Sequence, residues 1–462
     1  MRTVKWMMIG SLLGVVLTGV ATANEGWASG VRQPSSVQQT AFDYDPHLYF
    51  SAQDQASESP SDVTEVAPAD TGCVADSGDV CAPSCAPSCR RCRSGCCGCD
   101  LGDPWTLPQP CFLQSRGIEV GGWVSAGLFT NSLGATDNGP LGFNNVGDGF
   151  TMNQLWVYVE KATDTRGYGA DIGFRFDYVF GVDGPDTQSF GDEGWDFNWN
   201  PNSRDYGSAI PQLYVELAVN DLTVKLGHFY TLIGWEVVTA PDNFFYTHSY
   251  TMYYAEPFTH TGGLASWAVN DNVTVHGGWT MGWDSGWENL NDASTFLGGV
   301  SFALSDRTSL TWALTSGDFG AGKNGLSEGD IYMNSIVLEH QLTQRLSYIL
   351  QHDLGVNSNL PGGDNEWYGV NQYLVYQLND RWAGGLRFEW FRDDNGARVI
   401  QGNAGDYYEL TAGLNYKPHA NVMLRPEIRF DWYDGGVGGG RPFGNGTRNE
   451  QFSGGFDCIV TF

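Results

Sequence analysis

Short and long connections alternate strictly between the strands that this sequence predicts. From about Gly117 to Phe462 the chain reads as about sixteen alternating segments of roughly 10–14 residues, the length of tilted strands that cross a bilayer. The short connections follow the pattern of Val219-Asn220-Asp221-Leu222, in which Asn and Asp tolerate the left-handed backbone of tight hairpins. With an even number of strands, every long connection lies at one end and both termini lie at the other. This order predicts an all-β fold, an antiparallel up-and-down barrel that spans a membrane.

The two faces of each predicted strand differ in character. In residues 420–433, aliphatic and aromatic side chains alternate with Arg425, Glu427, Arg429 and Asp431. An unpaired charge that faces lipid costs about 2–4 kcal/mol at the bilayer midplane, so we expect the charged face to line the interior. A soluble sandwich with one solvated face is the alternative. The aromatic outer face, with Tyr and Trp near strand ends, favours the membrane barrel.

Both ends of the sequence indicate export to an outer membrane. Arg2 and Lys5 precede an apolar run, and Ala21-Thr22-Ala23 fits a cleavage site, so residues 1–23 are expected to be a signal peptide. The last predicted strand ends on Phe462 after alternating apolar residues. This ending resembles the signal that outer-membrane insertion machinery reads. We therefore predict a barrel in the lipid of a Gram-negative outer membrane.

Residues 24–116 differ in composition from the predicted barrel. They are rich in Ser, Pro, Asp, Gln and Ala, which predicts a disordered periplasmic linker. Most of the 10 cysteines of the chain lie in this linker, between residues 73 and 111. In an exported protein such a cluster favours disulfides, with a metal site or intermolecular crosslinks as the alternatives. The disulfide candidates are Cys73, Cys81, Cys85, Cys89, Cys92, Cys96, Cys97, Cys99 and Cys111.

The charge balance excludes several kinds of partner. The chain has 24 Lys and Arg against 53 Asp and Glu, a formal net charge of -29, which argues against nucleic acid because phosphate binding needs clustered basic residues. Much of the acidity lies in the long connections, where it should concentrate cations at one mouth of the barrel. The alternatives are that these acids keep the rim soluble or bind Ca²⁺ between lipopolysaccharide molecules. No catalytic motif appears, and we predict neither a cofactor nor a metal centre.

Residues 226–263 resemble the putative beta-barrel porin-2 family of Gram-negative bacteria, which includes planctomycete proteins. The resemblance rests on Gly227-His228-Phe229-Tyr230, Gly234-Trp235-Glu236, Asn243-Phe244-Phe245, His248-Ser249-Tyr250 and Pro257-Phe258-Thr259-His260-Thr261-Gly262. It implies a porin-like barrel over about 117–462 without naming a solute. The cysteine cluster lies outside it.

Two sets of residues are candidates for a pore constriction. The connection 232–259 is unusually aromatic, and either it folds into the barrel and narrows the pore or it packs on the rim as a plug or interface. In the first case Glu236, Asp242 and Glu256 lie near the constriction. The second set consists of charges on the inner strand faces, which either select polar solutes or pair across strands. These are Lys225, Arg387, Glu389, Arg425, Glu427, Arg429 and Asp431.

The sequence thus predicts a channel rather than an enzyme. We expect passive diffusion of small hydrophilic solutes with a preference for cations. The alternative is a structural barrel with a closed lumen, which anchors the envelope through its N-terminal linker or presents its loops as an adhesin does. A flat apolar wall would also permit a homotrimer.

Overall fold

The computed structural model describes residues 101–135, 137–190, 196, 205–320, 329–360, 362–435 and 440–462. The predicted signal peptide and the disulfide candidates from Cys73 to Cys99 lie outside these residues. Cys111 is described and is exposed in the short helix α3 (Cys111–Gln114). The pairing of the cysteines therefore stays a prediction.

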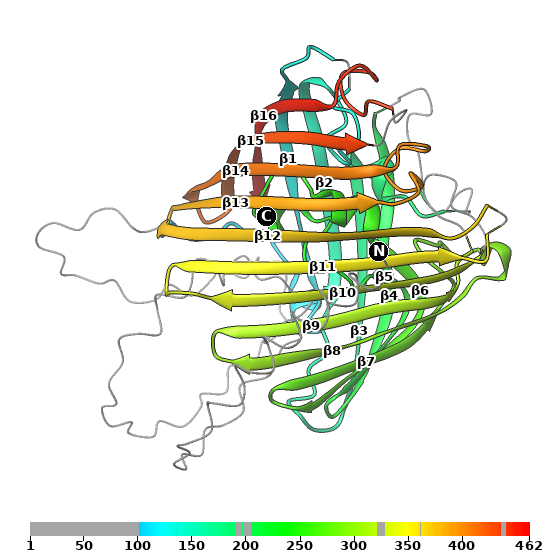
Figure 1. The fold of residues 1–462 in the computed structure, drawn as a ribbon. Helices are drawn as coiled ribbons and strands as arrows, with labels where there is room; N and C mark the ends of the chain where they lie inside the picture. The colour runs from blue at the N-terminus through cyan, green and yellow to red at the C-terminus, as the bar shows by residue number, and fades with distance from the viewer. Residues whose placement is uncertain are drawn as a thin grey trace, which may run out of the picture. The chain divides into compact units, whose positions relative to one another are not determined.

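Sixteen antiparallel strands form one closed barrel, in which each strand pairs with its neighbours in sequence and β1 pairs with β16. Figure 1 shows β9 to β15 side by side across one wall. The predicted strand number and topology are confirmed. The strands are β1 (Glu119–Asn131), β2 (Asp148–Lys161), β3 (Ala170–Gly181), β4 (Gly207–Val219), β5 (Leu222–Tyr230), β6 (Thr259–Asn270), β7 (Val273–Thr280), β8 (Ser294–Ser305), β9 (Thr308–Asp318), β10 (Asp330–Gln341), β11 (Leu346–Ser358), β12 (Asn365–Asn379), β13 (Trp382–Asp393), β14 (Gly405–His419), β15 (Val422–Gly435) and β16 (Glu450–Thr461).

Helices play a small part in the fold. In the described residues the helices besides α3 are α4 (Gly184–Thr187), η1 (Ala240–Asp242), η2 (Thr251–Ala255) and η3 (Leu290–Asp292). No helix in the described part of the chain is long and apolar enough to cross a membrane.

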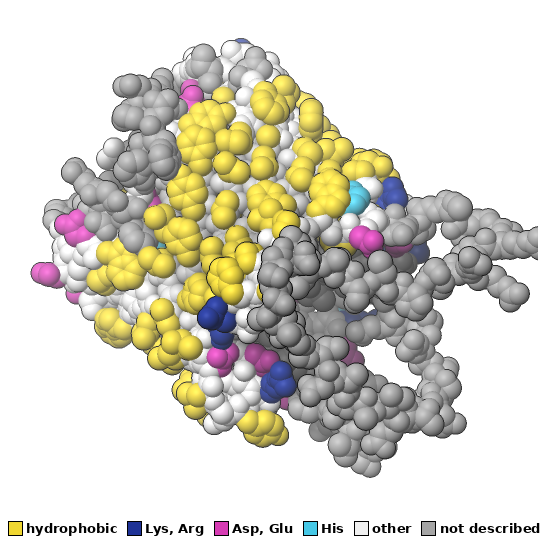
Figure 2. All heavy atoms as spheres, turned by 180° about the vertical axis from the view of Figure 1, so that it is seen from behind, with side chains coloured by type: hydrophobic (Ala, Val, Ile, Leu, Met, Phe, Trp, Pro, Cys, Tyr) yellow, Lys and Arg dark blue, Asp and Glu magenta, His cyan; other side chains and the backbone are white. Residues whose placement is uncertain are grey.

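The strand faces alternate as the sequence predicts. On β15 the outward Ile428 is 54% exposed, whereas the inward Arg429 and Asp431 are buried. Side chains on a strand point alternately to its two faces, so one face of each strand supplies the outer wall and the other the interior. Hydrophobic side chains cover the part of the wall seen in Figure 2.

The short turns use the chemistry that their residues predict. Between β12 and β13, Asn379 Oδ1 accepts the N–H groups of Arg381 at 3.0 Å and Trp382 at 3.1 Å. Between β4 and β5, Asn220 has a φ of 53° and its Oδ1 accepts the N–H of Gly169. Asn379 thus satisfies backbone donors of its own turn, and Asn220 satisfies a donor of the neighbouring connection between β2 and β3. We call this end of the barrel the short-turn end and the opposite end the long-loop end.

Residues 101–116, which their composition placed in a disordered linker, contact the short-turn end instead. The Trp105 ring stacks on His419 with a centroid separation of 4.4 Å. The Trp105 backbone is bound on both sides by Asn421, whose Oδ1 accepts at 2.5 Å and whose Nδ2 donates at 2.9 Å. Ala420 N–H donates to Leu101 O at 3.0 Å. One aromatic side chain and one amide therefore order a segment whose average composition is that of a linker.

Replacing Asn421 with Ala should release this segment. Losing about 1–2 kcal/mol of hydrogen bonding raises the detached population about tenfold, so chymotrypsin should cleave after Trp105 about tenfold faster. Asn395→Ala is the matched control, because Asn395 caps the N–H of Glu366 at the long-loop end. Equal cleavage rates in Asn421→Ala and the wild-type protein would contradict this account.

Candidate functional site

The connection between β5 and β6, residues 231–258, lies inside the barrel, and we call it the inward loop. It contacts opposite parts of the wall. Trp235 N–H donates to Gln351 Oε1 of β11 at 3.2 Å, and Gln154 Nε2 of β2 donates to Val238 O at 2.7 Å. Tyr250 OH donates to Asp431 of β15 at 2.8 Å. The loop therefore crosses the interior rather than packing on the rim.

The side chain of Arg425 of β15 binds backbone carbonyl groups in the first half of the inward loop. Its Nη1 lies 2.8, 2.7 and 2.9 Å from the carbonyl oxygens of Ala240, Asn243 and Phe245. Its Nη2 pairs with Asp457 of β16 at 2.7 Å. The planar guanidinium has five N–H donors, so one side chain can satisfy several carbonyl groups and a carboxylate.

Two glutamates of the same wall bind N–H groups of the inward loop. Tyr246 N–H donates to Glu427 of β15 at 2.8 Å. Tyr250 and Thr251 N–H groups donate to Glu389 of β13 at 2.7 and 2.6 Å. Buried backbone donors without partners are costly, and here the wall strands supply the acceptors.

Two further arginines close the network. Arg387 Nη1 of β13 bonds Glu236 and the carbonyl of Thr247, both at 2.6 Å. Arg429 Nη1 of β15 donates to His248 O at 2.6 Å. Burial lowers the pKa of His248 to about 4, so its imidazole is neutral at pH 7 and adds no charge to the network.

Glu409 of β14 joins the two arginines. It pairs with Arg387 and, at 3.2 Å, with Arg429, while Arg429 also pairs with Asp431 at 2.8 Å. All four side chains are buried. We call the charged residues of β13 to β16 that bind one another and the inward loop the charge ladder. It comprises Arg387, Glu389, Glu409, Arg425, Glu427, Arg429, Asp431 and Asp457.

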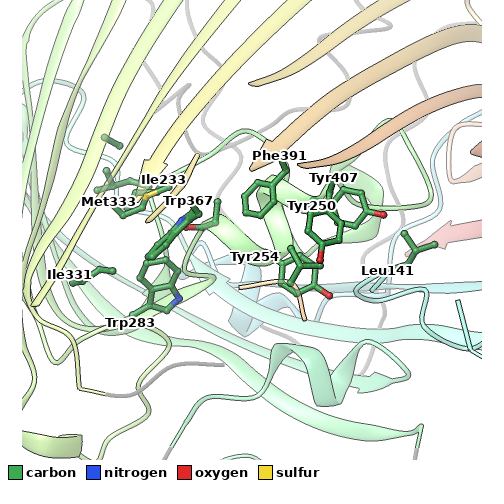
Figure 3. Packing of buried hydrophobic residues seen from close by; sticks show 14 of the residues in the cluster. Leu141, Ile233, Tyr250, Tyr254, Trp283, Ile331, Met333, Trp367, Phe391 and Tyr407 are labelled. Atoms are coloured by element: carbon green, nitrogen blue, oxygen red, sulfur yellow. The ribbon is translucent and has the colours of Figure 1, made fainter. Parts of the chain in front are cut away.

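Aromatic side chains of the same wall also pack against the inward loop. Figure 3 shows Tyr250 and Tyr254 of the loop beside Phe391 of β13 and Tyr407 of β14. Rings from the long-loop connections join this cluster, and Tyr253 OH donates to Asp186 at 2.8 Å. The long connections therefore fold down onto the inward loop.

A cavity of about 1240 Å³ lies between the inward loop and the short-turn end. Lys225, Glu236, Asp242 and Glu256 of the predicted constriction set line it. Arg387, Glu389, Arg425, Glu427, Arg429 and Asp431 do not line this cavity, because the inward loop covers them. Lys225 thus lies on the cavity wall with the three acids of the inward loop, whereas the other strand charges lie in the charge ladder.

Sequence reasoning missed several residues of this interior. Glu409 and Asp457 complete the charge ladder, and Gln351 and Asp353 of β11 contact the inward loop or its bound residues. The alternation of Glu409 with apolar Tyr408 and Leu410 was a signal that could have placed it inside. The role of Gln351 and Asp353 depends on where the inward loop lies, which strand alternation does not reveal.

A closed sixteen-stranded barrel with an apolar outer wall and a loop across its interior is the architecture of an outer-membrane porin. The family model described as putative beta-barrel porin-2, OmpL-like, matches residues 117–462. The chain belongs to this family, which confirms the family predicted from residues 226–263. Members of the family are porins, which are outer-membrane channels rather than enzymes. No curated protein matches the chain.

Solved porins share the fold at low sequence identity. An anion-selective porin from Comamonas acidovorans is 11% identical with a TM-score of 0.54, over 75% of this chain and 99% of that one. The outer-membrane channel DcaP of Acinetobacter baumannii is 9% identical with a TM-score of 0.51, over 75% and 97%. OmpF of Salmonella typhi, in complex with daunomycin, is 11% identical with a TM-score of 0.51, over 75% and 99%. Identities this low establish the barrel fold and nothing about the solute.

Arg425→Ala should strongly destabilise the protein. It leaves three loop carbonyls and the buried Asp457 without their main partner, and breaking a buried ion pair costs about 3–5 kcal/mol. We expect a loss of this size in the free energy of unfolding, measured by denaturant titration in detergent.

The matched control for this prediction is Arg392→Ala. Arg392 also pairs with two carboxylates, Asp394 and Asp406, but its side chain is 29% exposed and makes none of the described contacts to the inward loop. Its replacement should cost about 1 kcal/mol or less. Similar losses in the two variants would contradict a special role of Arg425.

Proposed function

We propose that the protein is a passive channel for small hydrophilic solutes that prefers cations. The observation that carries this proposal is the polar cavity beneath the inward loop, whose described lining holds more carboxylates than basic groups. The acidic residues are Glu119, Glu160, Glu236, Asp242, Glu256, Asp306 and Glu339, and the basic ones are Arg175, Lys225, Arg307 and Arg345.

Ion pairs reduce the number of free lining charges of both signs, and Glu236 is among the paired groups because it bonds Arg387 of the charge ladder. Arg175 bonds both Glu160 at 2.5 Å and Asp177 at 2.8 Å, so its charge is already matched by two carboxylates. The Lys225 ammonium lies 4.8 Å from the Tyr214 ring centre, which holds it against the wall. Rings of acidic side chains favour cations in a narrow aqueous path. The anion selectivity named for the Comamonas porin is a property of that protein.

The inward loop and its acidic residues would form the narrow part of this path. Glu236, Asp242 and Glu256 all face the cavity from the loop, as a constriction requires. The homotrimer, the contact with insertion machinery and the periplasmic position of the linker stay predictions from the sequence.

A closed structural barrel is the second candidate function. The tight packing of the inward loop against both the charge ladder and the aromatic cluster favours it. In this case the segment 101–116 at the short-turn end would connect the barrel to the envelope.

Single-channel recording in a planar bilayer under a salt gradient separates these functions. We expect stable conductance steps with a reversal potential on the cation side. The double variant Glu119→Gln/Glu339→Gln should reduce that preference, because it removes two carboxylates from the cavity wall. Asp164→Asn, in an exposed turn where Asp164 pairs with Arg166, is the control and should leave the reversal potential unchanged.

Two other outcomes of the recording would contradict the proposal. Steps that favour anions would exclude the cation preference but keep the channel. Correctly folded protein that produces no steps would exclude the channel and support the closed barrel.

A further inference from the structure

Two buried carboxylates meet where the end of the inward loop touches β11. Gln351 Nε2 donates to Glu256 Oε1 and, at 3.1 Å, to Asp353 Oδ1. The amide has a defined orientation because its own oxygen accepts the N–H of Trp235 at 3.2 Å. Gln351 therefore holds the two acids side by side and occupies one oxygen of each.

The negative charge of this pair is not matched by a basic side chain. Glu256 is 4% exposed and Asp353 is 0% exposed, and neither takes part in the ion pairs found within the described ranges. Burial, together with the neighbouring Asp353, raises the pKa of Glu256 well above its ordinary value. Two like charges this close and this deeply buried require a neutralising group, either a proton or a cation.

The carboxylate oxygens that Gln351 does not bind indicate a cation. Asp353 Oδ2 and Ser335 Oγ of β10 are both buried, and neither makes a well-formed hydrogen bond. Ser335 lies directly opposite Asp353 in the β10–β11 register, and both side chains are buried on the inner face. An unpaired buried polar atom is costly unless an ion or a water binds it.

Glu256 is the member of the pair that borders the cavity. Gly234 and Glu256 both line the cavity. A Cβ at position 234 would lie 2.0 Å from Glu256 Oε2, and Gly234 has a φ of 93°, so only glycine leaves this carboxylate in place.

We propose that Glu256, Asp353 and Ser335 form a binding site for a hard divalent cation, with Ca²⁺ as the best fit. Two carboxylates match its charge, and oxygen ligands with variable geometry are those that Ca²⁺ prefers. No three His, Cys, Asp or Glu side chains group as a metal site in the residues that the structure describes, so neutral oxygens and cavity water complete the coordination. The ion would tie the end of the inward loop to the wall.

Terbium luminescence tests this site on the full-length protein in detergent after chelator treatment. Tb³⁺ is an oxygen-seeking stand-in for Ca²⁺, and Trp235, which bonds Gln351, can sensitise its emission. We expect one Ca²⁺-displaceable signal per chain in the wild-type protein. Its affinity should fall about tenfold or more in Glu256→Gln and in Asp353→Asn, because each variant removes a charged ligand.

Asp183→Asn is the matched control. Asp183 is also a buried carboxylate, accepts a hydrogen bond from Gln154 Nε2 at 2.8 Å and lies outside the cavity lining, and its replacement should leave the Ca²⁺-displaceable signal intact. Equal signals in all four proteins would place the bound ion elsewhere on this acidic chain and overturn the proposal. A wild-type protein without any displaceable signal would mean that a shared proton neutralises the pair, which also overturns it.

Thermal unfolding of the wild-type protein tests the site even if a variant fails to fold. A ligand that binds only the folded state raises the unfolding temperature, so Ca²⁺ should do so for the wild-type protein and for Asp183→Asn. The absence of such a shift would contradict the site. The proposal does not depend on conduction, because ion binding in a protein without conductance steps would exclude the channel and retain the site.

Discussion

The organisation of the interior depends on the hydrogen bonds between the charge ladder and the backbone of the inward loop. A long irregular segment inside a membrane barrel must satisfy its N–H and C=O groups without regular secondary structure. Arg425 donates hydrogen bonds to three carbonyl oxygens of the loop. Glu427 and Glu389 accept hydrogen bonds from its N–H groups. The three arginines also pair with Glu236, Glu409, Asp431 and Asp457, whereas Glu389 and Glu427 are bound by the N–H groups of the loop.

This arrangement divides the barrel into two parts. The inner faces of β13 to β16 are committed to holding the inward loop, and their charges are covered by it. Residues of β1 to β6 and of β8 to β12 line much of the cavity on the other side of the loop. Any solute path through the described cavity therefore meets the residues of the second wall and of the loop itself. The charges that look most like a filter in the sequence serve to fix the loop.

Much of the fold followed from the sequence because it rests on local patterns. A period of two sets which side chains face inward, and Asn, Asp and Ser mark the tight turns, so the strands and their order could be predicted. The aromatic content of residues 232–259 also indicated that this connection would not lie in water. These features require no knowledge of distant contacts.

The site was less predictable because it depends on contacts between distant residues. Alternation places Arg387 inside the barrel, but it does not show that Glu236, some 150 residues earlier, will cover it. The same holds for Asp353, whose partner Glu256 reaches β11 only after the inward loop has crossed the interior. Residues 101–116 differ from the composition-based prediction for a similar reason, since Trp105 finds its partners near residue 420.

Amide hydrogen exchange of the native protein tests the central claim, that the inward loop is fixed to the wall by buried side chains. The N–H groups of Tyr246, Tyr250 and Thr251 donate to buried carboxylates and should exchange about as slowly as those of the neighbouring strand β13. The exposed connection around η3 provides the fast reference within the same chain. Exchange of residues 244–252 at the rate of that connection would contradict the account, because it would show a loop that is not held inside the barrel.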